Sequence, residues 1–167
     1  MTIFDIRPEA DADISVLHSL SAKAFGPGRF ARSAYRVREG VAAVPGLSLT
    51  AWHDGRLVGG VRFTAIRVGD DGGGLLLGPL VVDPALAGKG CGRALVQDGL
   101  ARARDAGFGF VLLIGDMSYY GRFGFTPSAP GKIVLPGPVD PARLLAVELR
   151  DGALRHVVAG QIVACAA

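Results

Sequence analysis

The sequence has few cysteines, the residues that cross-link small proteins through disulfides and that often bind metal ions. Only two of its 167 residues are cysteines, Cys91 and Cys165, and their separation matches no metal-binding spacing. Because two distant cysteines build no disulfide framework, we expect a protein of a reducing compartment, the cytoplasm. The N-terminal residues are too acidic for a secretory signal peptide, and no apolar run is long enough to cross a membrane.

Charge of one sign is nowhere concentrated. Lys and Arg number 18, Asp and Glu number 15, and the net charge is +3 without a run of like charge. A nucleic-acid surface usually gathers its basic residues on one face, so this balance favours a small anionic ligand. Half of the residues are hydrophobic, and the length suits one domain over residues 1–167 with a core of its own.

The order of hydrophobic patterns predicts an α/β fold with a mixed sheet. The turn Asp54-Gly55 predicts a hairpin, and the segment 75–114 predicts a right-handed crossover between parallel strands. Pro79 interrupts the apolar run Leu75–Val82, so we expect a bulge or a splayed strand there. We expect strands over 2–7, 47–53, 56–68, 75–82, 110–114 and 144–149. We expect helices from Asp11 or Asp13 to 26–28, over 30–38 and over 93–106, and a short turn or helix over 119–122. Residues 69–74 are expected to form a polar turn, and no element is assigned over 153–167.

A glycine-rich loop follows the run Leu75–Val82 and opens the next predicted helix. Gly88, Gly90 and Gly92 stand at alternate positions, which lets successive backbone N–H groups face one point. The positive end of the following helix points the same way. The loop therefore indicates a binding site for a phosphate or pyrophosphate group. A flexible turn that only needs small residues is equally compatible with this sequence.

Two nucleotide-binding loops do not fit these residues. A Walker A loop needs glycine at position 83 and Ser or Thr at position 90, where this chain has Asp83 and Gly90. A dinucleotide fingerprint starting at Gly88 fails at Arg93, and one starting at Gly90 fails at Leu95.

The segment 87–92 resembles the Arg/Gln-x-x-Gly-x-Gly/Ala acetyl-coenzyme A (acetyl-CoA) loop of the GNAT N-acetyltransferases, and the element order agrees with that family. Tyr120-Gly-Arg-Phe-Gly-Phe125 resembles the family's Tyr-x-x-x-Gly-Phe segment. Residues 77–84, together with Gly115-Asp116 and Tyr119-Tyr120, look most like the YhbS-type branch. The resemblance covers residues 3 to about 150.

This resemblance implies a mostly antiparallel sheet whose fourth and fifth strands splay to admit the pantetheine arm. It implies acetyl-CoA as cosubstrate and no metal. One departure stands out: the first loop position, usually Arg or Gln, is Ala87, so we expect weaker cofactor binding unless Lys89 or Arg93 supplies the cation. The residues expected to bind the cofactor are Leu80, Val81, Val82, Ala87, Gly88, Lys89, Gly90, Cys91, Gly92, Arg93 and Tyr119.

The same resemblance implies direct attack of an amine on the thioester, with Tyr120 as the general acid. A phenol of pKa about 10 and a thiol of pKa about 8.5 are close enough to share a proton. The general base is not evident. His18, His53, Glu39, Asp116 and a bound water all stay open.

Two further features have competing interpretations. The arginines between Arg29 and Arg38, around Tyr35, fit an acceptor site, a phosphate contact or a solvated helix face. Cys91 at a helix start is a candidate nucleophile, but no histidine follows it in a suitable context, so we expect only a small residue in the turn.

We therefore expect an N-acetyltransferase that acts on a primary amine of a small molecule or peptide, with no nucleic-acid or membrane partner. The alternative is a weak or inactive GNAT-fold domain that binds acyl-CoA as a sensor or interaction module. A different acyl group, such as succinyl or propionyl, and a homodimer both stay open.

Overall fold

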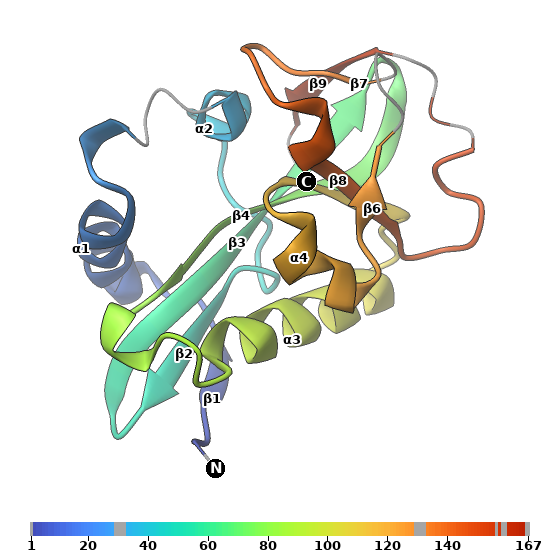
Figure 1. Ribbon diagram of the computed structural model, residues 1–167. Coiled ribbons are helices and arrows are strands. Elements are labelled where there is room, and N and C mark those ends of the chain that lie inside the picture. Colours follow the sequence, from blue (N-terminus) through green and yellow to red (C-terminus); the bar gives the residue numbers. More distant parts are fainter. Residues whose placement is uncertain (1, 29–32, 129–132, 156, 158–159, 166–167) are drawn as a thin grey trace.

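A computed structural model describes residues 2–28, 33–128, 133–155, 157 and 160–165. Along the chain, a strand is followed by two helices, three consecutive strands, a helix, a strand, a short helix and a final series of strands (Figure 1). The strands are β1 (Asp5–Pro8), β2 (Leu49–His53), β3 (Arg56–Val68), β4 (Asp71–Val82), β5 (Phe110–Ile114), β6 (Thr126–Pro127), β7 (Ile133–Val134), β8 (Leu144–Glu148) and β9 (Gly160–Ala164). The helices are α1 (Ile14–Phe25), α2 (Ser33–Arg38), α3 (Cys91–Asp105) and α4 (Met117–Tyr120), with single 3-10 turns at Asp11–Asp13, Pro84–Leu86, Gly121–Phe123 and Pro141–Arg143.

The sheet is mixed and mostly antiparallel, as predicted. Its order along the main path is β1-β2-β3-β4-β5-β8-β6, and only the β4–β5 pair on that path is parallel. The hairpin between β2 and β3 turns at Asp54 and Gly55, both left-handed with φ of 49° and 73°. Such a pair matches the twist of the flanking strands, so the Asp-Gly signal is confirmed.

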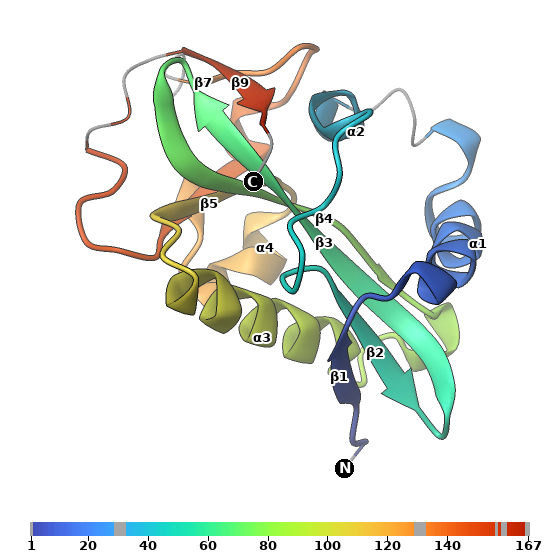
Figure 2. The ribbon, with the colours of Figure 1, turned by 180° about the vertical axis from the view of Figure 1, so that it is seen from behind.

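Helices cover both faces of the sheet, and two adjacent glycines of β3 show which helix covers which face. A Cβ on Gly59 would lie 3.1 Å from Sγ of Cys91 in α3, whereas a Cβ on Gly60 would lie 2.5 Å from the Leu17 side chain in α1. Because successive strand residues point to opposite faces, α1 and α3 pack on opposite sides (Figures 1 and 2).

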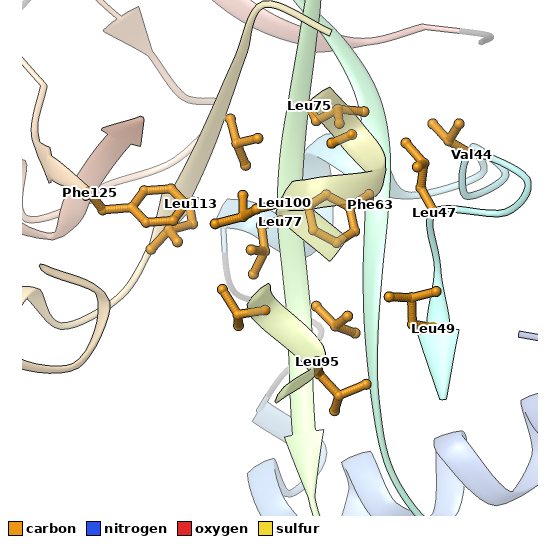
Figure 3. Packing of buried hydrophobic residues seen from close by; sticks show 14 of the residues in the cluster. Val44, Leu47, Leu49, Phe63, Leu75, Leu77, Leu95, Leu100, Leu113 and Phe125 are labelled. Atoms are coloured by element: carbon orange, nitrogen blue, oxygen red, sulfur yellow. The ribbon is translucent and has the colours of Figure 1, made fainter. Parts of the chain in front are cut away.

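The larger core lies between α3 and the sheet. Leu95 and Leu100 of α3 pack over Phe63 and Leu77, while Phe125 extends the layer beyond Leu113 of β5 (Figure 3). Gly99 lets α3 approach closely, since a Cβ there would come within 2.5 Å of the Phe63 ring. Leu95 is fully buried, so truncating it to alanine should cost about 2–5 kcal/mol.

The strands β4 and β5 separate before β4 ends. Their ladder joins Gly74–Leu76 to Phe110–Leu112, and β4 then continues alone to Val82 on that side. On its other side β4 pairs with β3, where the register shifts between Val61↔Leu80 and Phe63↔Leu77. The shift spans Gly78-Pro79, so the bulge and the splay that Pro79 predicts are both confirmed.

The structure differs from the sequence prediction at several boundaries and elements, of which three are instructive. Helix α3 begins at Cys91, two residues before the predicted start, because Gly90 already serves as its N-cap. Strand β4 begins at Asp71, inside a predicted turn; Gly74 there must lack a side chain because the Phe110 ring occupies the space. Strand β9 was not predicted, since its short pairing with Ile66–Val68 of β3 joins distant segments (Figure 2). The predicted helix over 30–38 is α2, and its first residues lie outside the described part.

Candidate active site

The glycine loop joins the free end of β4 to α3. Gly88 and Gly90 have φ of 75° and 94°, a left-handed conformation in which a side chain is strained. Nothing lies within 4 Å of a Cβ built at either position, so the surface over the loop is open. At Gly88 and Gly90 the loop therefore presents backbone atoms instead of side chains.

Several backbone N–H groups of this loop lack a hydrogen-bond partner in the part of the chain that the structure describes. Within the described residues, no backbone carbonyl accepts a hydrogen bond from the N–H of Gly88, Gly90, Cys91, Gly92 or Arg93. The last three belong to the first turn of α3, which also carries the positive end of the helix dipole. This arrangement fits an anion cradle for a phosphate group.

The side chains around the loop determine whether a positive charge lies close to it. Ala87 is exposed and adds no cation, while Lys89 and Arg93 are exposed beside it. Gly92 allows a close contact: a Cβ there would lie 2.6 Å from the Tyr119 hydroxyl. The Tyr119 phenol therefore lies against the first turn of α3.

The surroundings of Cys91 do not suit a nucleophilic cysteine. Its side chain is buried against β3, and burial raises the pKa of its thiol to about 11. At neutral pH the sulfur is thus a thiol, which is a poor nucleophile. The geometry fits a small residue that packs under the loop.

Tyr120 comes from α4, just after β5. Gly115 makes room for it, since a Cβ there would lie 2.5 Å from the Tyr120 ring. Tyr119 and Phe125 meet this ring edge-on, with centroids 4.9 Å and 5.9 Å away. Burial, and to a lesser degree Tyr119 and Asp116, raise the pKa of Tyr120 well above the ordinary value. The phenol is therefore held in its protonated form.

A cavity of about 720 Å³ opens on the α1 side of the sheet, where β4 and β5 diverge. Its walls come from α1, α2, the end of β4, the segment Ile114–Asp116 and α4. Leu80, Val81, Tyr119 and Tyr120 all line it, so the structure brings these predicted residues together. The loop residues 87–93 and Val82 lie outside its lining, at the far end of β4.

The structure separates the four candidate bases. Asp116 and His18 line the cavity, whereas Glu39 is exposed outside its lining. His53 lines a different hollow, where Nδ1 lies 3.2 Å from the Ile3 carbonyl oxygen and Nε2 lies 3.4 Å from Asp54. Of these four predicted bases, Asp116 and His18 therefore share the cavity with Tyr120.

The cavity also contains charged residues that sequence reasoning missed. Arg143 pairs with Asp116 at 3.3 Å, and Arg62 of β3 donates from a terminal nitrogen to Oε1 of Glu9 at 3.2 Å. No motif marks these residues, since each comes from a separate element. From the basic segment predicted by the sequence, Tyr35 and Arg38 line the cavity; Arg29 and Arg32 fall outside the described residues.

Two features are absent from the described residues. No group of three His, Cys, Asp or Glu side chains there is placed to hold a metal ion. No described helix is long and apolar enough to cross a membrane.

Comparison with known proteins agrees with this geometry. Residues 15–125 match the profile of the acetyltransferase (GNAT) family. The chain is 35% identical over 132 residues to the uncharacterized N-acetyltransferase YjhQ of Escherichia coli strain K12, covering 77% of this chain and 72% of the relative. It is 30% identical over 153 residues to the uncharacterized N-acetyltransferase YhbS of the same strain, covering 91% of each.

Solved structures agree as well. The crystal structure of E. coli YhbS in complex with CoA has a TM-score of 0.83 and 28% identity, covering 99% of this chain and 91% of that one. A GNAT acetyltransferase from Brucella melitensis in complex with acetyl-CoA has a TM-score of 0.64 and 30% identity, covering 88% and 97%. The open glycine loop, the divergent β4 and β5 strands, the family match over residues 15–125 and these relatives agree: the chain belongs to the GNAT acetyltransferase family.

Proposed function

We propose that this chain transfers the acetyl group of acetyl-CoA to a primary amine of a small molecule or peptide, by direct attack within a ternary complex. The observation that carries the proposal is the shared cavity of Tyr120 and the unpaired end of β4. The CoA and acetyl-CoA held by the two solved relatives support the same cosubstrate.

The residues present fit a CoA thioester. Beyond Leu76, β4 has no β5 partner among the described residues. Backbone groups of Leu80, Val81 and Val82 would pair with the pantetheine amides along this free edge. One of these N–H groups would polarise the thioester carbonyl, which needs a donor where negative charge develops. The N–H groups of the glycine loop would hold the pyrophosphate, with Lys89 or Arg93 in place of the cation that Ala87 lacks.

Tyr120 would protonate the departing thiolate. Its raised pKa keeps the proton on the phenol through neutral pH, and Arg143 acts in the opposite direction by lowering that pKa. A positioned acid of this kind typically contributes about 10²- to 10⁴-fold. Asp116, His18 or a water would take the proton from the amine, because Asp116 and His18 are the two sequence-predicted bases that line this cavity.

The competing function is a domain that binds acyl-CoA without turnover, and the observation that favours it is Ala87. A single experiment distinguishes the two functions. Purified protein with acetyl-CoA is offered a panel of small and peptide amines, and free thiol is followed spectrophotometrically. Amine-dependent thiol release supports transfer, whereas cofactor binding without release for any amine supports the sensor.

A further inference from the structure

Charged side chains of both signs line the cavity where β4 and β5 diverge. Among the described residues of its lining, three are acids and three are arginines: Glu9, Asp116, Asp140, Arg38, Arg62 and Arg143. Arg62 lies 3.2 Å from Glu9 and Arg143 lies 3.3 Å from Asp116, so acids of the same cavity neutralise these two arginines. The formal charges of the six side chains sum to zero. Such a cavity suits a ligand that carries no net charge or carries both signs equally.

Arg38 differs from the other two arginines in its position. It ends α2, and the preceding Val37 is buried in a hydrophobic cluster that includes Leu76 of β4. A Cβ built on Gly78 would lie 3.5 Å from a terminal nitrogen of Arg38, so the guanidinium lies at the bulge of β4. The Tyr35 ring lies beside it, with its centroid 5.7 Å from the guanidinium carbon. The side chain is partly exposed, and both Arg38 and Gly78 line the cavity.

This bulge adjoins the place where the proposed reaction would occur. Gly78-Pro79 directly precedes Leu80–Val82, whose backbone would hold the pantetheine arm, and Tyr120 lines the same cavity. A group bound by Arg38 would therefore lie close to the attacking amine. A guanidinium has five N–H donors in a planar fork, so it can bind an anion of the acceptor in addition to its contacts within the protein.

The balance of charge in the cavity decides which anion fits. A guanidinium binds carboxylates and phosphates alike. A phosphate group carries about 1.5–2 negative charges at neutral pH, so it would leave an excess of negative charge on an acceptor with one amine. One carboxylate beside one ammonium adds no net charge. The cavity therefore favours an amine with a single carboxylate.

We propose that Arg38 binds a carboxylate of the acceptor, so that the acceptor is an α-amino acid or another small amine with a carboxylate beside the amine. The inference rests on the proposed function for the meaning of acceptor, but the site itself is tested by binding alone. Arg38 is a specificity residue here, and no step of the acetyl transfer passes through it.

The test uses three probes with the same side chain: leucine, leucinamide and 3-methylbutylamine. They carry a carboxylate, a neutral amide or neither group beside the amine, and the branched chain suits the apolar part of the lining, which includes Ile14, Leu17 and Leu77. Each probe is titrated into the full chain in the presence of CoA, with binding followed by ligand-observed NMR. A second set, alanine, alaninamide and ethylamine, repeats the comparison with a smaller side chain.

We expect the amino acid of at least one set to bind about tenfold more tightly than its amide and its amine. The reason is that paired hydrogen bonds between a guanidinium and a carboxylate are worth at least about that factor. Equal binding within both sets, or no binding of either amino acid, would overturn the site.

Substitutions test whether the preference depends on Arg38. Arg38→Gln should remove it, and Arg38→Lys should keep only part of it, because lysine has the charge without the planar fork. The second variant also serves if the first folds poorly by circular dichroism. The matched control is Arg36→Gln, which should keep the preference, because Arg36 lies on the same helix but is exposed outside the cavity lining. If both Arg38 variants keep the full preference, the assignment to Arg38 is wrong.

The two proposals fail in different ways. Thiol release with amines but no preference for a carboxylate would overturn this site alone. A preference for amino acids that depends on Arg38, without thiol release for any amine, would overturn the transferase and leave the site standing.

Discussion

The glycine loop and the Glu9–Arg62 pair are built by opposite means. In the loop, consecutive residues present backbone N–H groups, and the left-handed Gly88 and Gly90 fix their direction. In the pair, two side chains that are far apart in the sequence form an ion pair, with Glu9 just after β1 and Arg62 on β3. A site of consecutive backbone groups leaves a motif in the sequence, and a site of distant side chains leaves none. The glycine loop can therefore be predicted from the sequence, whereas the Glu9–Arg62 pair is seen only in the fold.

The largest predicted effect on acetyl-CoA binding comes from a substitution in the glycine loop. Gly90→Val places a branched side chain at φ of 94°, where strain of about 1–3 kcal/mol and blocked backbone approach should weaken acetyl-CoA binding by about 100-fold or more. Calorimetry measures the affinity. Gly107→Val is the matched control, because Gly107 has φ of 88°, lies just past the other end of α3 and is equally open. Similar affinity of the two variants would contradict the cradle.

The second prediction separates chemistry from binding. Tyr120→Phe should lower kcat by about 10- to 1,000-fold, with the acetyl-CoA affinity nearly intact, because only the proton donor is lost. Tyr119→Phe should instead raise the KM for acetyl-CoA, since its hydroxyl lies against α3. Initial rates over a range of acetyl-CoA concentrations give both constants. An unchanged kcat in Tyr120→Phe would remove Tyr120 from the acid role.

The pH profile sharpens the same assignment. An acid must be protonated to act, and the pKa of Tyr120 is raised by burial, so activity should persist above pH 10, where an ordinary tyrosine has lost half its protons. The wild-type kcat should therefore show no alkaline fall near pH 10. A fall centred at or below that pH would show that another group, or an unshifted phenol, supplies the proton.

A smaller effect should follow from restoring the missing cation. Ala87→Arg should tighten acetyl-CoA binding by about 3- to 10-fold, because an added arginine can bond a phosphate oxygen, and added salt should reduce the gain. Ala85→Arg, in the exposed turn just before the loop, is the control for net charge alone. An equal gain in both variants would indicate long-range attraction instead of a loop contact.

The smallest effect concerns the buried cysteine. Cys91→Ala should change kcat by no more than about twofold, since a thiol with its pKa raised to about 11 is a poor nucleophile. Thiol-release rates measured beside the wild type decide the point. A loss comparable to that of Tyr120→Phe would make Cys91 part of the chemistry.

Local patterns in the sequence predicted most of the fold. The Asp54-Gly55 turn, the apolar run before the loop and Pro79 each act through neighbouring residues, so the hairpin, the buried strand and the bulge were all predicted. Strand β9 was missed because its few pairs join residues far apart along the chain. Gly74 was assigned to a turn because a glycine that makes room for Phe110 looks the same in sequence as a glycine that turns the chain.

The same physical distinction divides the site. Tyr120 and the loop residues follow one another in short motifs, so they could be named in advance, and their roles stay predictions. Glu9, Arg62 and Arg143 belong to elements that only the sheet topology brings to one cavity. The sequence offers both His18 and His53 as candidate bases, and the fold places His53 in a different hollow.

The proposed function requires that the glycine loop and the free end of β4 hold acetyl-CoA. A calorimetric titration of the purified chain with acetyl-CoA, with CoA and ATP as comparison ligands, tests this requirement. We predict micromolar binding of acetyl-CoA and CoA and much weaker binding of ATP, which shares the phosphates but lacks the pantetheine arm. No binding of acetyl-CoA at millimolar concentration, or equal binding of ATP, would contradict it.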